Sequence, residues 1–176
     1  MKRLILPFFV GVLFLIFQTT LLPFFPIQRI RPDILLIFTL YLTFLFPPIS
    51  GGILALVLGY LTDLFSGNAF GFYTFSRPFL FFAAYLFKER FYLEGFSSQF
   101  LFVFAFGNLE GILILILLNA FQPVSIENFY HVLCTLLLPH TFFTGLITPI
   151  LFLLFQKVSS PLFREPESES RRELRP

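Results

Sequence analysis

The sequence predicts an all-α polytopic membrane protein that crosses a bilayer six times. Of its 176 residues, 57% are hydrophobic and only 12% are charged, whereas soluble domains carry roughly a quarter charged residues. The apolar residues fall into runs that approach the about 20 residues needed to cross a hydrocarbon core of about 30 Å. The basic residues gather on one side of this arrangement. We therefore expect a transmembrane domain over residues 1–157.

The first three expected spans occupy the N-terminal third of the chain. The first run, Leu4–Leu22, follows Lys2-Arg3, and the residues at its end form a poor cleavage site for a secretory signal, so we interpret it as a retained span. The second and third runs cover about 33–46 and 49–65. Only Pro47-Pro48 separates them, which predicts a tight helical hairpin.

The other three spans are expected at about 70–87, 99–121 and 129–155. Residues 158–176 are rich in charge and poor in apolar side chains, so they predict a disordered tail. Six spans place both termini on one side, and the positive-inside rule makes the more basic side cytoplasmic. That side holds Lys2, Arg3, Lys88, Arg90, Lys157, Arg164, Arg171, Arg172 and Arg175, and the opposite side holds Arg29 and Arg31.

Three ionisable residues fall near the middle of the expected spans: Arg77, Glu110 and His140. Such residues are costly in a bilayer unless they are paired or hydrated. We expect Arg77 and Glu110 to form a buried ion pair, with Asn108 or His140 nearby. The pair could fix helix register or belong to a ligand or proton site, and the alternative is that the two side chains do not meet. His140 follows Pro139, so its imidazole could instead satisfy a carbonyl that the proline frees.

Small residues recur every four positions along the third span and lead to a carboxylate. Small residues at this spacing let another helix approach closely, either within the bundle or from another protein. The fifth span repeats the device with Gly107 and Gly111. The third-span stripe consists of Gly51, Ala55, Gly59 and Asp63.

Several classes of function are excluded or disfavoured by what the sequence lacks. It contains no zinc-protease motif, phosphate-binding loop or serine nucleophile paired with a base, so we expect no enzyme and no cofactor. Cys134 stands alone and no second histidine lies at metal-ligand spacing, so we expect neither a disulfide nor a metal. No basic face indicates nucleic acid as a partner.

Two segments carry a family resemblance. Arg31-Pro32-Asp33-Ile34-Leu35-Leu36 opens the second span, and the residues from Gly59 to Gly71, which read GYLTDLFSGNAFG, close the third. In order and spacing they resemble the bacterial rod-shape-determining protein MreD. The resemblance implies a cytoplasmic-membrane protein of the cell-elongation machinery that is not an enzyme. It also implies an MreC-like bitopic partner, a link through it to an MreB-like cytoskeleton and peptidoglycan synthases, and a fold like the S-components of energy-coupling-factor vitamin transporters.

On this resemblance, a partner helix would contact the third-span stripe or a neighbouring groove near the extracytoplasmic rim. Locally, Ser66-Gly67 is expected to end the helix, Asp63 to accept from backbone amides of the following turn, and Gly71 to allow a second bend. The partner-binding candidates are Gly51, Ala55, Gly59, Asp63, Ser66, Gly67, Gly71, Arg31 and Asp33.

Two other functions stay open at this point. A vitamin-binding S-component typically carries an Ala-x3-Ala docking motif on its first helix, whereas the first span here has Gly11 as its small residue and the chain has no Trp. A channel or proton relay through Arg77, Glu110 and His140 would need a more continuous polar path.

Overall fold

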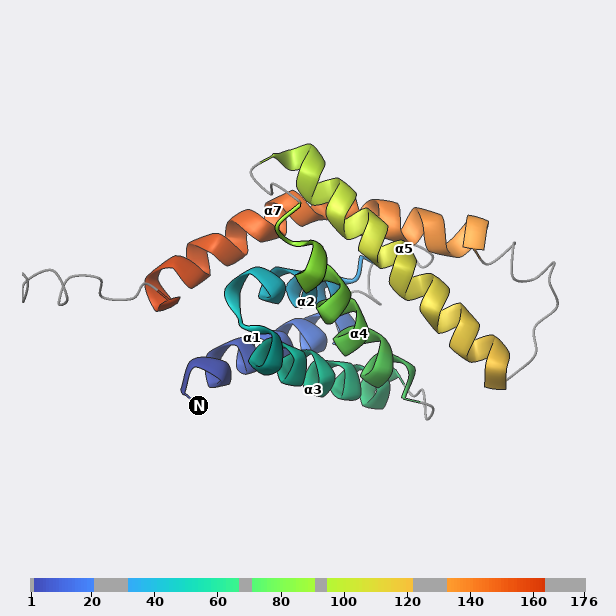
Figure 1. Cartoon of the computed structure of the whole chain (residues 1–176), viewed down its shortest axis with the longest axis horizontal. Helices are drawn as coiled ribbons and strands as arrows, with labels where there is room; N and C mark the ends of the chain where they lie inside the picture. Colours follow the sequence, from blue (N-terminus) through green and yellow to red (C-terminus); the bar gives the residue numbers. More distant parts are fainter. Residues whose placement is uncertain (1, 21–31, 67–70, 91–94, 122–132, 164–176) are drawn as a thin grey trace, which may run out of the picture.

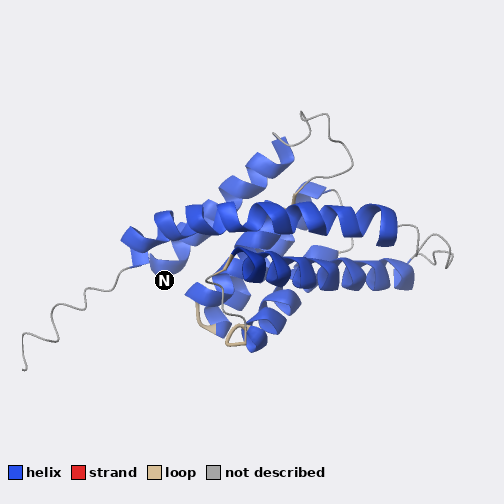
Figure 2. Ribbon diagram, turned by 90° about the horizontal axis from the view of Figure 1, so that it is seen from above, coloured by secondary structure: helices blue, strands red, loops and turns tan. Residues whose placement is uncertain are grey.

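The computed structural model describes residues 2–20, 32–66, 71–90, 95–121 and 133–163. Within these ranges the chain is helical apart from short connections, and no strand occurs in them (Figures 1 and 2). The elements are α1 (Lys2–Thr20), α2 (Ile34–Leu45), α3 (Pro48–Ser66), α4 (Phe72–Phe87), α5 (Phe96–Phe121), the π-helical turn η2 (Leu133–Leu137) and α7 (Leu138–Phe163), which continues η2 directly.

Each expected span overlaps one of these α-helices, and the bounds differ by several residues at some ends. Three helical stretches are long and apolar enough to cross a membrane, namely Pro48–Ser66, Phe96–Phe121 and Cys134–Lys157, while Leu4–Thr20 and Ile34–Leu45 are shorter apolar helices. The described part of the chain is thus a set of helices compatible with a membrane protein, and the number of six crossings stays a prediction. The last helix continues to Phe163, past the domain boundary expected at Lys157.

Helix α2 lies at the centre of the bundle (Figure 1). It contacts each of the other five α-helices of the described chain, and every residue from Ile34 to Thr43 is buried. Aromatic rings surround it, since Phe38 packs against Phe14 and Phe155 at centroid distances of 5.5 Å each. A helix that is apolar on all sides belongs in the interior of a bundle, which explains why α2 has so few polar residues.

Helices α3 and α4 form the closest pair. A Cβ atom added at Gly59 would lie 2.9 Å from the carbonyl carbon of Tyr73 and 3.2 Å from Cβ of Arg77. A Cβ added at Gly51 would lie 2.7 Å from Cε2 of Phe81. The glycines therefore let the α4 backbone and its rings come into direct contact with α3, which fixes the position of Arg77 on α4.

Candidate functional site

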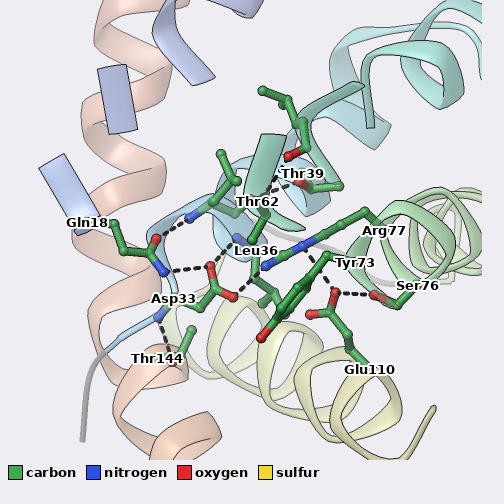
Figure 3. A network of polar contacts seen from close by, with 12 residues as sticks. Gln18, Asp33, Leu36, Thr39, Thr62, Tyr73, Ser76, Arg77, Glu110 and Thr144 are labelled. Carbon is green, nitrogen blue, oxygen red and sulfur yellow. Dashed lines mark hydrogen bonds and ion pairs between the residues drawn. The ribbon is translucent and has the colours of Figure 1, made fainter. Parts of the chain in front are cut away.

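A cluster of three buried charges links α2, α4 and α5 (Figure 3). The Arg77 side chain on α4 is fully buried, and its Nη2 donates to Oδ2 of Asp33 at 2.5 Å. Its Nε lies 3.1 Å from Oε1 of Glu110 on α5. The two carboxylate side chains are 11% and 4% exposed. Because a buried charge is costly unless it is paired, each member depends on the others.

Asp33 connects the cluster to the outer helices of the bundle. It is the N-cap residue of α2, and its Oδ1 accepts from the amide of Leu36 at 2.8 Å and from Nε2 of Gln18 on α1 at 3.4 Å. The amide of Asp33 donates to Oγ1 of Thr144 on α7 at 3.2 Å. An ionised cap accepts strongly from the first amides of a helix, so one carboxylate both starts α2 and holds Arg77.

Glu110 has a different environment on each of its oxygens. Oε1 accepts from Oγ of Ser76 at 3.1 Å and faces Arg77. Within the described part of the chain, Oε2 accepts no hydrogen bond. Nη1 of Arg77 is likewise buried without a hydrogen-bond partner among the described residues. The Tyr73 ring covers the guanidinium, with Cζ of Arg77 5.5 Å from the ring centroid, a distance at which a cation–π attraction operates.

A cavity of about 280 Å³ lies beside the cluster, between α2, α4, α5 and α7. Its apolar lining comes from leucine and isoleucine side chains together with Gly107 and Gly111. Its polar lining consists of Asp33, Tyr73, Glu110, His140, Thr141 and Thr144. Both acidic residues of the cluster therefore line this cavity, whereas Arg77 is not part of its lining.

The structure brings Arg77 and Glu110 together as the sequence analysis expected, and it places His140 on the wall of the adjoining cavity. No hydrogen bond of the His140 imidazole occurs among the described residues, and its role towards a freed carbonyl stays a prediction. The π-helical turn η2 ends just before Pro139 and gives the chain a widened turn there. Asn108 lies outside the cluster, since its Nδ2 donates to the carbonyl of Phe104.

The third-span stripe faces α4 of the same chain. Gly51, Ala55, Gly59 and Asp63 are all buried, and α3 and α4 share the largest contact in the bundle. Of the two packing partners left open by the sequence, the structure shows the intramolecular one. The outward face of α3 is exposed and apolar instead, at Ile49, Ile53, Leu56, Tyr60 and Leu64.

Asp63 caps the start of α4 from the neighbouring helix. Its carboxylate accepts from the amides of Tyr73 at 3.0 Å and Thr74 at 2.7 Å, and from Oγ1 of Thr74 at 2.6 Å. Gly71 precedes α4 with φ of 70°, the left-handed conformation that glycine adopts without strain. Asp63 thus accepts from backbone amides of the first turn of α4, ten and eleven residues along the chain, and Gly71 has the conformation expected at a bend. Ser66 is exposed at the end of α3, whereas Arg31 and Gly67 lie outside the described residues.

Asp33, a partner-binding candidate from the sequence, lies in the buried cluster. The site also contains three polar residues that the sequence did not indicate, namely Gln18, Ser76 and Thr144, which bind the cluster's carboxylates or backbone. The sequence contains a weak indication of two of these residues. Gln18 and Ser76 are polar residues inside apolar runs, and Ser76 directly precedes the arginine.

Comparison with known proteins gives one match. A family model described as rod shape-determining protein MreD matches residues 2–158, which include α1 to α5, η2 and most of α7. No curated protein and no solved structure shows a significant match.

Proposed function

We propose, because this chain belongs to the MreD family of rod shape-determining proteins, that it is a non-enzymatic membrane scaffold of the machinery that elongates the bacterial cell wall. The family match over nearly all of the described helices is the observation that carries this proposal. The buried cluster supports a structural role, since Arg77 and the two carboxylates chiefly engage one another. They tie three helices into one rigid unit, as a platform for partners requires.

The proposed location is the bacterial cytoplasmic membrane, with six crossings and both termini in the cytoplasm. The uneven distribution of basic residues supports this orientation. Lys88 and Arg90 occupy the turn after α4, and Nζ of Lys88 lies 3.9 Å from the centroid of the Tyr85 ring. A lysine over a tyrosine at a helix end is typical of a membrane–water interface.

The proposed direct partner is an MreC-like bitopic protein, and through it an MreB-like cytoskeleton and peptidoglycan synthases. Because the small-residue stripe packs on α4, we place the contact on the opposite, outward face of α3. Tyr60 lies on that face and is 52% exposed. This face adjoins the segment from Gly59 to Gly71 that carries the family resemblance, and the bonds from Asp63 to α4 make that end rigid. A rigid apolar face suits a single transmembrane helix.

Depletion of the protein in its host, grown with vitamins supplied, tests the proposed function. If the protein is an elongation scaffold, rods will widen into spheres while vitamins are plentiful. Unchanged width would contradict the scaffold. Growth that fails only when a vitamin is withheld would favour an S-component, a role for which the cavity beside the cluster is the supporting observation.

Site-directed photocrosslinking tests the partner surface separately. A photoreactive amino acid at Tyr60 should capture the MreC-like partner in living cells. The matched control is Leu153 on α7, which is similarly exposed at 56%. Equal capture from both positions, or capture only from Leu153, would contradict the α3 contact without touching the family assignment.

A further inference from the structure

The cavity beside the charge cluster has an acidic lining that the proposed scaffold role does not explain. Its lining includes the two acidic residues Asp33 and Glu110 but not Arg77, the guanidinium that pairs with them. Two carboxylic acids and one guanidinium leave the cluster with one acidic group in excess, beside His140 on the cavity wall. In a low-dielectric interior a positive charge beside the excess carboxylate stabilises its ionised form, so the cavity favours a positively charged occupant.

Several hydrogen-bond acceptors near the cavity have no donor among the described residues and could therefore bind such an occupant. Oε2 of Glu110 accepts no hydrogen bond from the described residues, although the side chain is only 4% exposed. His140 and Tyr73 line the same cavity, and neither the imidazole nor the phenol makes a hydrogen bond within the described chain. Asp33 differs, since its oxygens already accept from Arg77, Leu36 and Gln18. A carboxylate oxygen, an imidazole nitrogen and a phenol oxygen can each accept an N–H bond of a primary ammonium group.

We propose that this cavity binds the primary ammonium group of a small amphipathic amine, with Glu110 Oε2 as the anionic acceptor. The volume of about 280 Å³ is below the roughly 300–1,000 Å³ typical of drug-sized ligands, so the occupant is small. The apolar lining accommodates a short carbon segment attached to the ammonium. The amine is either a free molecule or the ethanolamine headgroup of a phospholipid, which share this chemistry. The inference does not depend on the proposed scaffold role.

The experiment measures thermal stability of the full chain in nanodiscs of phosphatidylcholine, which has no N–H donors. The fraction that remains monodisperse after heating is read by size-exclusion chromatography, because the chain lacks Trp and the exposed Cys134 would react with thiol dyes before unfolding. Ethanolamine is titrated against ethylene glycol, its neutral isostere, and against choline, which has no N–H, at constant ionic strength. A second arm adds phosphatidylethanolamine to the nanodiscs.

Three variants sharpen the test. Glu110→Gln removes the anionic acceptor at nearly constant volume, and Glu89→Gln makes the same change at an exposed position remote from the cavity. Leu136→Phe narrows the cavity from a lining residue that is 45% exposed, so the larger ring can be accommodated without repacking the core. If Glu110→Gln does not fold, Leu136→Phe carries the test.

The expected result is that ethanolamine raises the transition temperature of the wild type and Glu89→Gln by roughly 5–10 °C at a hundredfold excess over Kd. Ethylene glycol and choline leave it unchanged, and Glu110→Gln and Leu136→Phe lose the shift. If phosphatidylethanolamine alone gives the shift and added ethanolamine does nothing more, the source is the lipid headgroup. An equal shift with ethylene glycol, a shift retained in both cavity variants, or no shift in either arm would overturn the proposal.

Discussion

Replacing Arg77 by methionine removes the guanidinium that two buried carboxylates share. Methionine fills similar space but cannot donate to Asp33 or form an ion pair with Glu110, so two carboxylic acids remain together in the interior without a base. Breaking a buried ion pair from one side costs about 3–5 kcal/mol. Both carboxylates lose their partner here, so we expect a loss near the upper end, about 5 kcal/mol, which lowers the transition temperature by about 10–20 °C.

A second variant separates charge from packing. Adding Asp33→Asn and Glu110→Gln to Arg77→Met removes the unmatched charges while keeping the shapes, so most of the lost stability should return. The control is Arg90→Met, an exposed arginine in the turn after α4, where we expect a change within about 0.5 kcal/mol. The assay is the heating and chromatography protocol above. The reasoning fails if Arg77→Met costs no more than Arg90→Met, or if the triple variant is no more stable than the single one.

Three further substitutions test other contacts. Gly59→Ala places a methyl group against the Tyr73 backbone, so it should lower the free energy of unfolding by about 1–3 kcal/mol. The control Gly95→Ala, with nothing within 4 Å of its Cβ, should be nearly neutral. Equal thermal stability of the two variants would contradict the close α3–α4 contact. Asp63→Ala removes three acceptor contacts at the start of α4 and should cost about 1–2 kcal/mol in the same assay, while an unchanged transition temperature would show that this cap is dispensable. Thr144→Val keeps the side-chain shape but removes the acceptor of the Asp33 amide, so the free energy of unfolding should fall by about 1 kcal/mol. A fall above about 3 kcal/mol in the same thermal assay would mean that the hydroxyl supports more than this bond.

The helices and the Arg77–Glu110 contact could be predicted because lipid makes charges rare and costly. An arginine and a glutamate deep in separate apolar runs have few alternatives to meeting each other. Some helix boundaries also had a local cause, such as Pro47-Pro48 before α3 or Gly71 before α4. These signals act between residues close in the sequence, so they predict helix ends without knowledge of the tertiary structure.

The role of Asp33 could not be predicted in this way. Counting residues treats each span as a full-length helix, which puts the first residue of a span at the membrane surface. Helix α2 has only 12 residues, so at a rise of about 1.5 Å each it is about 18 Å long, well short of a core of about 30 Å. Its N-cap Asp33 is buried in the bundle, where Arg77 pairs with it. Burial depth depends on which helices surround α2, and a single sequence does not contain that information.

The order of the charge cluster along the chain has a consequence for how the protein enters the membrane. Asp33 is synthesised first, Arg77 follows on α4, and Glu110 comes last on α5. A helix carrying one unpaired charge is penalised by about 2.5–3.5 kcal/mol on insertion. Once α4 has emerged, Asp33 and Arg77 neutralise each other, and α5 then delivers its carboxylate to an arginine already in place. The bundle is therefore expected to leave the insertion machinery as a group of helices from α2 to α5 and not one span at a time.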